Sequence, residues 1–174
     1  MLLTAGTAWS AIPDHAAGLI VGGGVLGSHL SDRTYLGFTY AFPLSAHWLQ
    51  DLAWGFKVHG EADLARWHGC TGADCGYVTD VGATSVFRTE LSSSPDMDWY
   101  LDLAVGAHLI SRTRIASQVY STGFQFSEFM GTGLLFGEQR HYEVGARLMH
   151  ESNGDWKTPN DGMDFLMLNM AMRW

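Results

Sequence analysis

The stretch DWYLDLAVGAHLI, from Asp98 to Ile110, alternates between two kinds of side chain along its whole length. The odd-numbered positions are all apolar: Trp99, Leu101, Leu103, Val105, Ala107 and Leu109. The even-numbered positions include Asp98, Tyr100, Asp102, Gly106 and His108. Successive side chains of a strand point to opposite faces, so alternation with no helical repeat predicts a strand with one apolar face.

The same alternation recurs in both directions from this stretch, clearly in residues 33–42 and 52–59. We expect eight strands, at residues 16–28, 33–42, 49–60, 77–89, 98–110, 124–136, 140–152 and 163–174. Most links between them are short enough for hairpins, which predicts one all-antiparallel meander and a single domain over residues 1–174. Residues 1–15 are expected to be a signal-peptide remnant or a disordered N-terminus.

The composition indicates where the apolar faces point. Hydrophobic residues make up 47% of the chain and charged residues 16%, below the ~25% of an ordinary soluble domain. A soluble barrel or lipocalin-like binder would need a charged exterior, whereas a membrane barrel turns apolar side chains to lipid. The other face of the expected strands is rich in Gly, Thr and Ala, and is expected to place Asp51, Lys57, Asp102 and Arg147 inside.

We therefore predict an all-β fold, an eight-stranded antiparallel transmembrane β-barrel of the outer-membrane type. The charge-free stretch from Ala16 to Ser31 is too short and too rich in glycine for a membrane-spanning helix. The final strand ends in Trp174 after alternating apolar positions, which resembles the targeting signature of bacterial outer-membrane barrels. A formal net charge of −8 argues against a nucleic-acid partner.

Two cysteines lie close together in the expected link between the third and fourth strands. An even number of strands puts both chain ends on the periplasmic side, so this link is expected outside the cell. Cys70 and Cys75 enclose four residues, which in an exported protein indicates one small loop disulfide. Two free thiols remain the alternative.

Polar side chains occupy the apolar face near the end of the seventh expected strand. His150 and Ser152 share the parity of Val144 and Leu148, and Asp164 shares that of Leu166 on the next strand. Polar groups facing lipid are costly unless they interact. They form a serine-hydrolase set: Ser152 as nucleophile, His150 as base and Asp164 as the acid that orients the imidazole.

The residues after Ser152 complete this hypothesis. The Asn153 side chain and a backbone N–H near Gly154 are expected to stabilise the oxyanion. The alternative interpretation is that these residues are inert polar groups at the rim of a structural or adhesive barrel.

The segment from His150 to Asp164, HESNGDWKTPNDGMD, resembles the signature of the lipid A 3-O-deacylase (PagL) family of outer-membrane enzymes. That signature has His-x-Ser-Asn, a short loop, Pro-Asn-Asp-Gly and an acidic residue twelve positions after the Ser. A looser similarity extends from about residue 16 to Trp174. The family usually has Glu where this chain has Asp164, so Asp161 and Glu151 are alternative carboxylates, although Glu151 has inward parity.

The resemblance implies an eight-stranded barrel that hydrolyses the ester-linked 3-hydroxyacyl chain at the 3-position of lipid A. It places the catalytic Ser and His on Ser152 and His150, and an activity-critical Asn on Asn153. We expect the site at the outer-leaflet side of the bacterial outer membrane, with lipopolysaccharide as substrate. No cofactor and no metal are expected, because the three side chains supply every group needed and no histidine pair shows a ligand spacing. An outer-membrane phospholipase is the alternative enzyme.

Overall fold

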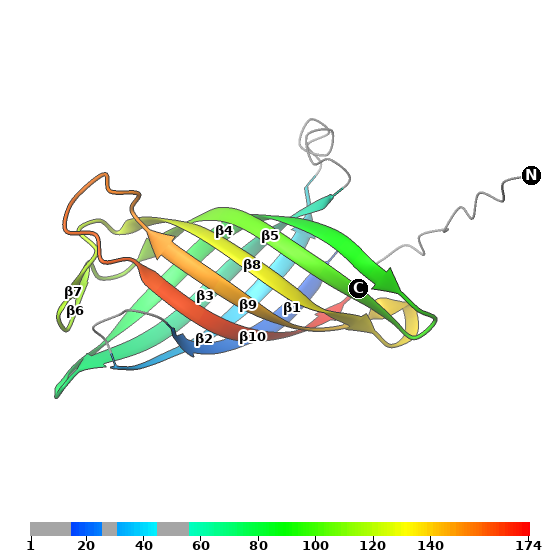
Figure 1. Ribbon diagram of the computed structural model, residues 1–174, viewed down its shortest axis with the longest axis horizontal. Helices are drawn as coiled ribbons and strands as arrows, with labels where there is room; N and C mark the ends of the chain where they lie inside the picture. Colours follow the sequence, from blue (N-terminus) through cyan, green and yellow to red (C-terminus); the bar gives the residue numbers. More distant parts are fainter. Residues whose placement is uncertain (1–14, 26–30, 45–55) are drawn as a thin grey trace, which may run out of the picture.

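Eight strands of the chain close into one barrel in the computed structural model, which describes residues 15–25, 31–44 and 56–174 (Figure 1). The barrel strands are β1 (Ala16–Gly24), β2 (Ser31–Pro43), β3 (Lys57–Thr71), β4 (Asp74–Ser93), β5 (Met97–Ile110), β8 (Phe124–Phe136), β9 (Tyr142–Ser152) and β10 (Met163–Arg173). Every neighbouring pair is antiparallel, and β1 closes the barrel against β10. The prediction of an eight-stranded antiparallel barrel is confirmed.

Three short elements lie in the links. β6 (Arg114–Ile115) and β7 (Gln118–Val119) form a small hairpin between β5 and β8, and the 3₁₀ turn η1 (Glu138–Arg140) precedes β9. Figure 1 shows this hairpin and the loop between β9 and β10 at the same end of the barrel, away from the C-terminus. No helix in these described ranges is long and apolar enough to cross a membrane.

Side chains alternate between the interior and the exterior as the sequence predicts. On β5, Leu103, Val105 and Leu109 are exposed while Asp102 and His108 are buried. The exposed large side chains of β1, β2, β9 and β10 are likewise apolar: Leu19, Val21, Leu36, Phe38, Val144, Leu148, Leu166, Leu168 and Met170. An apolar exterior around a polar interior is the arrangement of a barrel surrounded by lipid, and it contradicts the soluble alternative.

The third and fourth strands differ from the prediction. They run over Lys57–Thr71 and Asp74–Ser93, whereas we expected residues 49–60 and 77–89. Lys57 has the inward parity that we expected, because it lies opposite the buried Arg88, whereas Val58 lies opposite the outward Phe87; Lys57 is exposed because it begins the strand at the mouth of the barrel. Asp51 lies outside the described residues. The expected strands stop short because apolar side chains also fill this end of the barrel: the β3–β4 ladder continues to Thr71 and Asp74, where the inward residues Ala65 and Trp67 are apolar.

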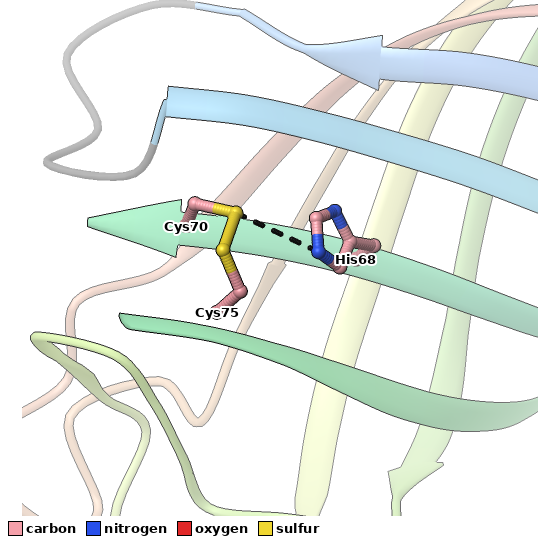
Figure 2. A group of neighbouring side chains, drawn as sticks. All are labelled: His68, Cys70 and Cys75. Atoms are coloured by element: carbon pink, nitrogen blue, oxygen red, sulfur yellow. Dashed lines mark hydrogen bonds between the residues drawn. A yellow bond between two sulfur atoms is a disulfide. The ribbon is translucent and has the colours of Figure 1, made fainter. Parts of the chain in front are cut away.

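The turn between β3 and β4 carries the two cysteines. Cys70 and Cys75 are paired across the hairpin and form a disulfide (Figure 2). The ring of His68 lies beside them, with Nε2 3.5 Å from the Cys70 sulfur. Gly72 makes the turn with a φ of 60°, a left-handed conformation that glycine adopts without steric cost.

Paired charges fill the barrel interior from its middle toward the end that holds the C-terminus. Arg88 donates to Asp102 at 2.7 and 2.8 Å and to Glu143 at 2.9 and 3.0 Å. Four residues after Glu143 on β9, Arg147 donates to Glu61, and its Nη2 lies 2.8 Å from Oε2. The expected inside positions of Asp102 and Arg147 are therefore confirmed. Buried ions need such partners, because an unpaired charge in a low-dielectric interior is expensive.

Apolar and aromatic side chains close the end of the barrel opposite the C-terminus. Trp67 packs against Tyr120 and Phe165, with ring centroids 6.1 and 5.6 Å apart, and Tyr35 packs on Phe165 at 5.1 Å. Tyr120 follows the β6–β7 hairpin and is fully buried. The small hairpin thus inserts a side chain into the barrel mouth, so that the interior is a packed core and not an open pore.

Candidate active site

Strand β9 carries His150 and Ser152 to the outer face of the barrel. Its inward positions are Glu143, Arg147, Met149 and Glu151, all buried. His150 lies opposite Asp164 on β10 and opposite Glu128 on β8, and Ser152 lies opposite Phe126. The period of two therefore puts the imidazole, the hydroxyl and two carboxylates on one outward patch.

His150 and Asp164 form a hydrogen-bonded pair. The distance from Nδ1 to Oδ1 is 2.8 Å, and each side chain is 38% exposed. Aspartate is one methylene shorter than glutamate, yet it reaches the ring because the two residues are directly opposite across the β9–β10 ladder. A carboxylate that accepts from Nδ1–H leaves Nε2 unprotonated and able to accept a proton.

The two alternative carboxylates are engaged elsewhere. The side chain of Asp161 accepts a hydrogen bond from the backbone N–H of Val119 at 2.7 Å. Glu151 is fully buried inside the barrel, as its parity predicts. Of the three acidic residues considered in the sequence, Asp164 is the one in contact with the imidazole.

Ser152 is half-buried and lies two positions from His150 on the same face of β9. Its hydroxyl makes no hydrogen bond within the ranges that the structure describes, so the serine and the imidazole are neighbours that are not yet bonded. Catalytic hydrogen bonds of unliganded enzymes are often long and tighten only when substrate is bound.

Gly162 packs directly against the ring of His150. A Cβ atom built on Gly162 would lie 3.0 Å from Cε1 and 3.7 Å from Nε2 of that ring. The residue also has a φ of 60°, which favours glycine. The sequence offered Gly162 only as part of a motif; its contact with the imidazole depends on the path of the loop before β10.

The Asn153 side chain is placed differently from our expectation. It is fully buried, and Nδ2 donates to the backbone carbonyls of Tyr120 and Lys157, each at 2.8 Å. Its backbone N–H donates to Oδ1 of Asn160 at 3.2 Å. Both amide protons of the side chain are thus committed to the loop, so it organises the backbone around Ser152 and has no proton left for an oxyanion.

The backbone of Gly154 fits the oxyanion expectation better. Its N–H makes no hydrogen bond within the described part of the chain, the residue is exposed, and its φ is 64°. A free backbone N–H two residues after the serine is a suitable donor to a developing negative charge.

Contacts between two loops hold this arrangement in place. The loop between β9 and β10 meets the loop that follows β7. Asn153 binds the carbonyl of Tyr120, Asp161 binds the N–H of Val119, and Ser121 donates to the carbonyl of Pro159 at 2.7 Å. These partners are more than 30 residues apart in sequence, and no local sequence pattern connects them.

An apolar groove extends from the polar patch along the outside of the barrel. Its walls come from four strands: Phe87 on β4, Leu103 and Val105 on β5, Met130 on β8 and Leu148 on β9. His150, Asp164 and Glu128 lie at one end of it. Beside Ser152, Phe124, Phe126 and the 72% exposed Trp156 pack on one another with ring centroids 4.9–5.8 Å apart.

Comparison with known proteins gives consistent matches over most of the chain. Residues 34–173 match the family Lipid A 3-O-deacylase (PagL). The lipid A deacylase PagL of Bordetella bronchiseptica is 28% identical over 122 residues, which is 70% of this chain and 65% of that protein. The lipid A deacylase PagL of Pseudomonas aeruginosa is 28% identical over 134 residues, 74% of this chain and 73% of that protein.

The chain thus spans just under two thirds of the Bordetella relative and somewhat more of the Pseudomonas relative. Among solved structures, the crystal structure of the outer membrane enzyme PagL superposes with a TM-score of 0.71 at 20% identity, covering 92% of this chain and 99% of that one. At this identity the superposition supports the fold.

Proposed function

The chain belongs to the lipid A 3-O-deacylase (PagL) family, and on that premise we propose that it is an outer-membrane esterase that removes the ester-linked 3-hydroxyacyl chain at the 3-position of lipid A. One observation carries the proposal: the 2.8 Å bond between His150 and Asp164, on the outward patch that also holds Ser152. Polar and ionisable side chains on a lipid-facing surface are costly, and they commonly mark a functional site.

The reaction follows from the positions of these groups. Asp164 holds the imidazole proton on Nδ1, so Nε2 of His150 takes the proton of the Ser152 hydroxyl as its oxygen attacks the ester carbonyl. The Gly154 N–H stabilises the negative charge that develops on the carbonyl oxygen. His150 then gives the proton to the departing sugar oxygen, and water, activated by the same imidazole, releases the 3-hydroxy acid from Ser152.

The surroundings of the site support a lipid substrate that arrives sideways through the membrane. The acyl chain would lie in the apolar groove that begins at His150 and runs past Leu148 and Met130. We place the site at the outer leaflet, where lipopolysaccharide resides. The turn between β3 and β4, which carries the Cys70–Cys75 disulfide, lies at the same end of the barrel as the loop between β9 and β10 (Figure 1), and disulfides persist in exported proteins.

Replacing Ser152 with alanine tests this function. Wild-type protein folded in detergent should release a 3-hydroxy fatty acid from lipopolysaccharide, and mass spectrometry of the remaining lipid A should show the loss at the 3-position. The Ser152→Ala variant should migrate as a folded barrel in unheated gels and release none. Deacylation by that variant would refute the assignment of the nucleophile. Acid release from phospholipids alone would instead favour the phospholipase interpretation.

A further inference from the structure

Three carboxylates surround one imidazole inside the barrel, directly behind the active site. Nδ1 of His108 lies 3.0 Å from Oδ1 of Asp80 and 3.1 Å from Oε1 of Glu151, and Nε2 lies 3.6 Å from Oδ1 of Asp63. All four side chains are at most 8% exposed. They come from β3, β4, β5 and β9, so no spacing in the sequence reveals them.

The hydrogen bonds within this group do not balance. The single N–H at Nδ1 of His108 faces two carboxylates and can serve only one well. Both oxygens of Glu151, together with Oδ2 of Asp80 and Oδ2 of Asp63, are buried and accept no hydrogen bond from the residues that the structure describes. Buried carboxylate oxygens of native proteins normally have partners, so these point to a ligand.

The charges do not balance either. Even an imidazolium on His108 leaves an excess of negative charge beside three ionised carboxylates. The buried arginines do not bind these carboxylates within the described residues: Arg147 binds Glu61, Arg88 binds Asp102, and Arg33 makes one 3.5 Å contact to a backbone carbonyl while its Nε and Nη1 have no partner there. Uncompensated negative charge in a dry interior is strongly unfavourable, so a cation or additional protons must offset it.

We propose that His108, Asp80 and Glu151, with Asp63 beside them, bind a divalent cation of the zinc type. Zinc takes imidazole nitrogen and carboxylate oxygen at about 2.0–2.2 Å, and a tetrahedral complex then spaces neighbouring ligand atoms roughly 3.3 Å apart. The separations of 3.0 and 3.1 Å from Nδ1 to the two carboxylates are close to this spacing. An imidazole ligand favours zinc over the all-oxygen sites of calcium or magnesium. This proposal differs from the sequence-based expectation of no metal, which stays a prediction.

A second trio of metal-ligand residue types, His68 with Cys70 and Cys75, lies at the β3–β4 turn (Figure 2). Its two sulfurs are joined in a disulfide, and metals bind the thiolate. His68 therefore provides a matched control: a histidine close to two other metal-ligand residue types in the same barrel, at a place where we expect no metal.

The cation would have a structural role that does not depend on the proposed reaction. Glu151 lies between His150 and Ser152 on β9 and points to the opposite face. A metal held by Glu151 on β9, Asp80 on β4 and His108 on β5 ties the inner side of β9 to strands two and three positions away around the barrel, so it fixes the strand segment that carries the outward pair.

Metal analysis tests this site without any activity assay. The barrel is folded in detergent, equilibrated separately with Zn²⁺, Mn²⁺ and Ca²⁺, freed of unbound metal and analysed by mass spectrometry of the elements. We expect about one equivalent of Zn²⁺ per chain, because one site is proposed, in the wild type and in His68→Gln. His108→Gln and Asp80→Asn should fall to background. A chelator should lower the Tm of the wild type and leave that of His108→Gln unchanged.

A spectrum of the unaltered protein covers the case in which the variants do not fold. Co²⁺ bound by one imidazole and carboxylates in a tetrahedral site gives intense visible absorption bands, and added Zn²⁺ should abolish them. A folded wild type that binds no Zn²⁺, Mn²⁺ or Ca²⁺ and shows no such bands would overturn the proposal, leaving protons as the balancing charge. Equal metal binding by His108→Gln would overturn it as well.

Discussion

Substituting Gly162 with alanine should weaken catalysis by displacing one imidazole ring. The new methyl carbon would lie 3.0 Å from Cε1 of His150, a contact that requires the ring to move by a few tenths of an ångström. The bond to Asp164 holds the other edge of that ring, so the shift alters the direction in which Nε2 faces Ser152. Since a displacement of 1 Å can cost about 100-fold in rate, a few tenths should lower kcat roughly three- to tenfold.

The same substitution also introduces backbone strain. Gly72→Ala is the control, because it introduces that strain without a new side-chain contact. Gly72 has the same φ of 60°, but nothing lies within 4 Å of the place that its new methyl carbon would take. Each alanine should cost about 1–2 kcal/mol of stability, because a left-handed residue with a Cβ is crowded. Release of 3-hydroxy fatty acid should fall only in Gly162→Ala, while both variants unfold at lower urea concentrations. Equal activity of the two variants would refute the role of Gly162 in positioning His150.

Two further substitutions test the site and the barrel interior. Asp164→Asn should lower kcat by about 10³–10⁴-fold with little change in KM, because the amide favours the wrong imidazole tautomer. Asp164→Glu should recover much of the loss. Steady-state kinetics on lipopolysaccharide measure both variants, and an unchanged kcat in Asp164→Asn would show that Asp164 is dispensable. Arg147→Met leaves Glu61 buried without its partner and should destabilise the barrel by about 3–5 kcal/mol, whereas the double variant with Glu61→Leu should recover most of it. Urea unfolding, followed by gel mobility, measures the stability of the single and the double variant. A double variant as unstable as Arg147→Met would count against the Arg147–Glu61 pair.

The sequence was most informative where outward positions face lipid, because those positions must then be apolar. On β5, apolar side chains occupy every outward position, so alternation alone identified both faces. On β3 the same reasoning ended the strand at residue 60, but the ladder with β4 continues to Thr71, where the inward residues Ala65 and Trp67 are apolar. Alternation reports two environments and does not distinguish lipid from a dry apolar interior.

The candidate site divides in a similar way. His150, Ser152 and Asp164 are close in sequence and share one parity, so strand geometry was enough to bring them to one face. The bonds of Asn153 depend on Tyr120, which arrives from a loop 33 residues away, and no local pattern contains that information. The buried cluster around His108 draws on four strands, and only the closed barrel brings its members together.

Covalent labelling tests directly whether Ser152 is a nucleophile that His150 activates. The folded barrel is treated with a serine-reactive alkyl phosphonate in detergent containing lipopolysaccharide, then digested and sequenced by mass spectrometry. We expect an adduct on Ser152 that depends on His150 and is lost in His150→Ala, because that imidazole must remove the hydroxyl proton. An unlabelled Ser152 in active enzyme, or an adduct on a different serine, would contradict it.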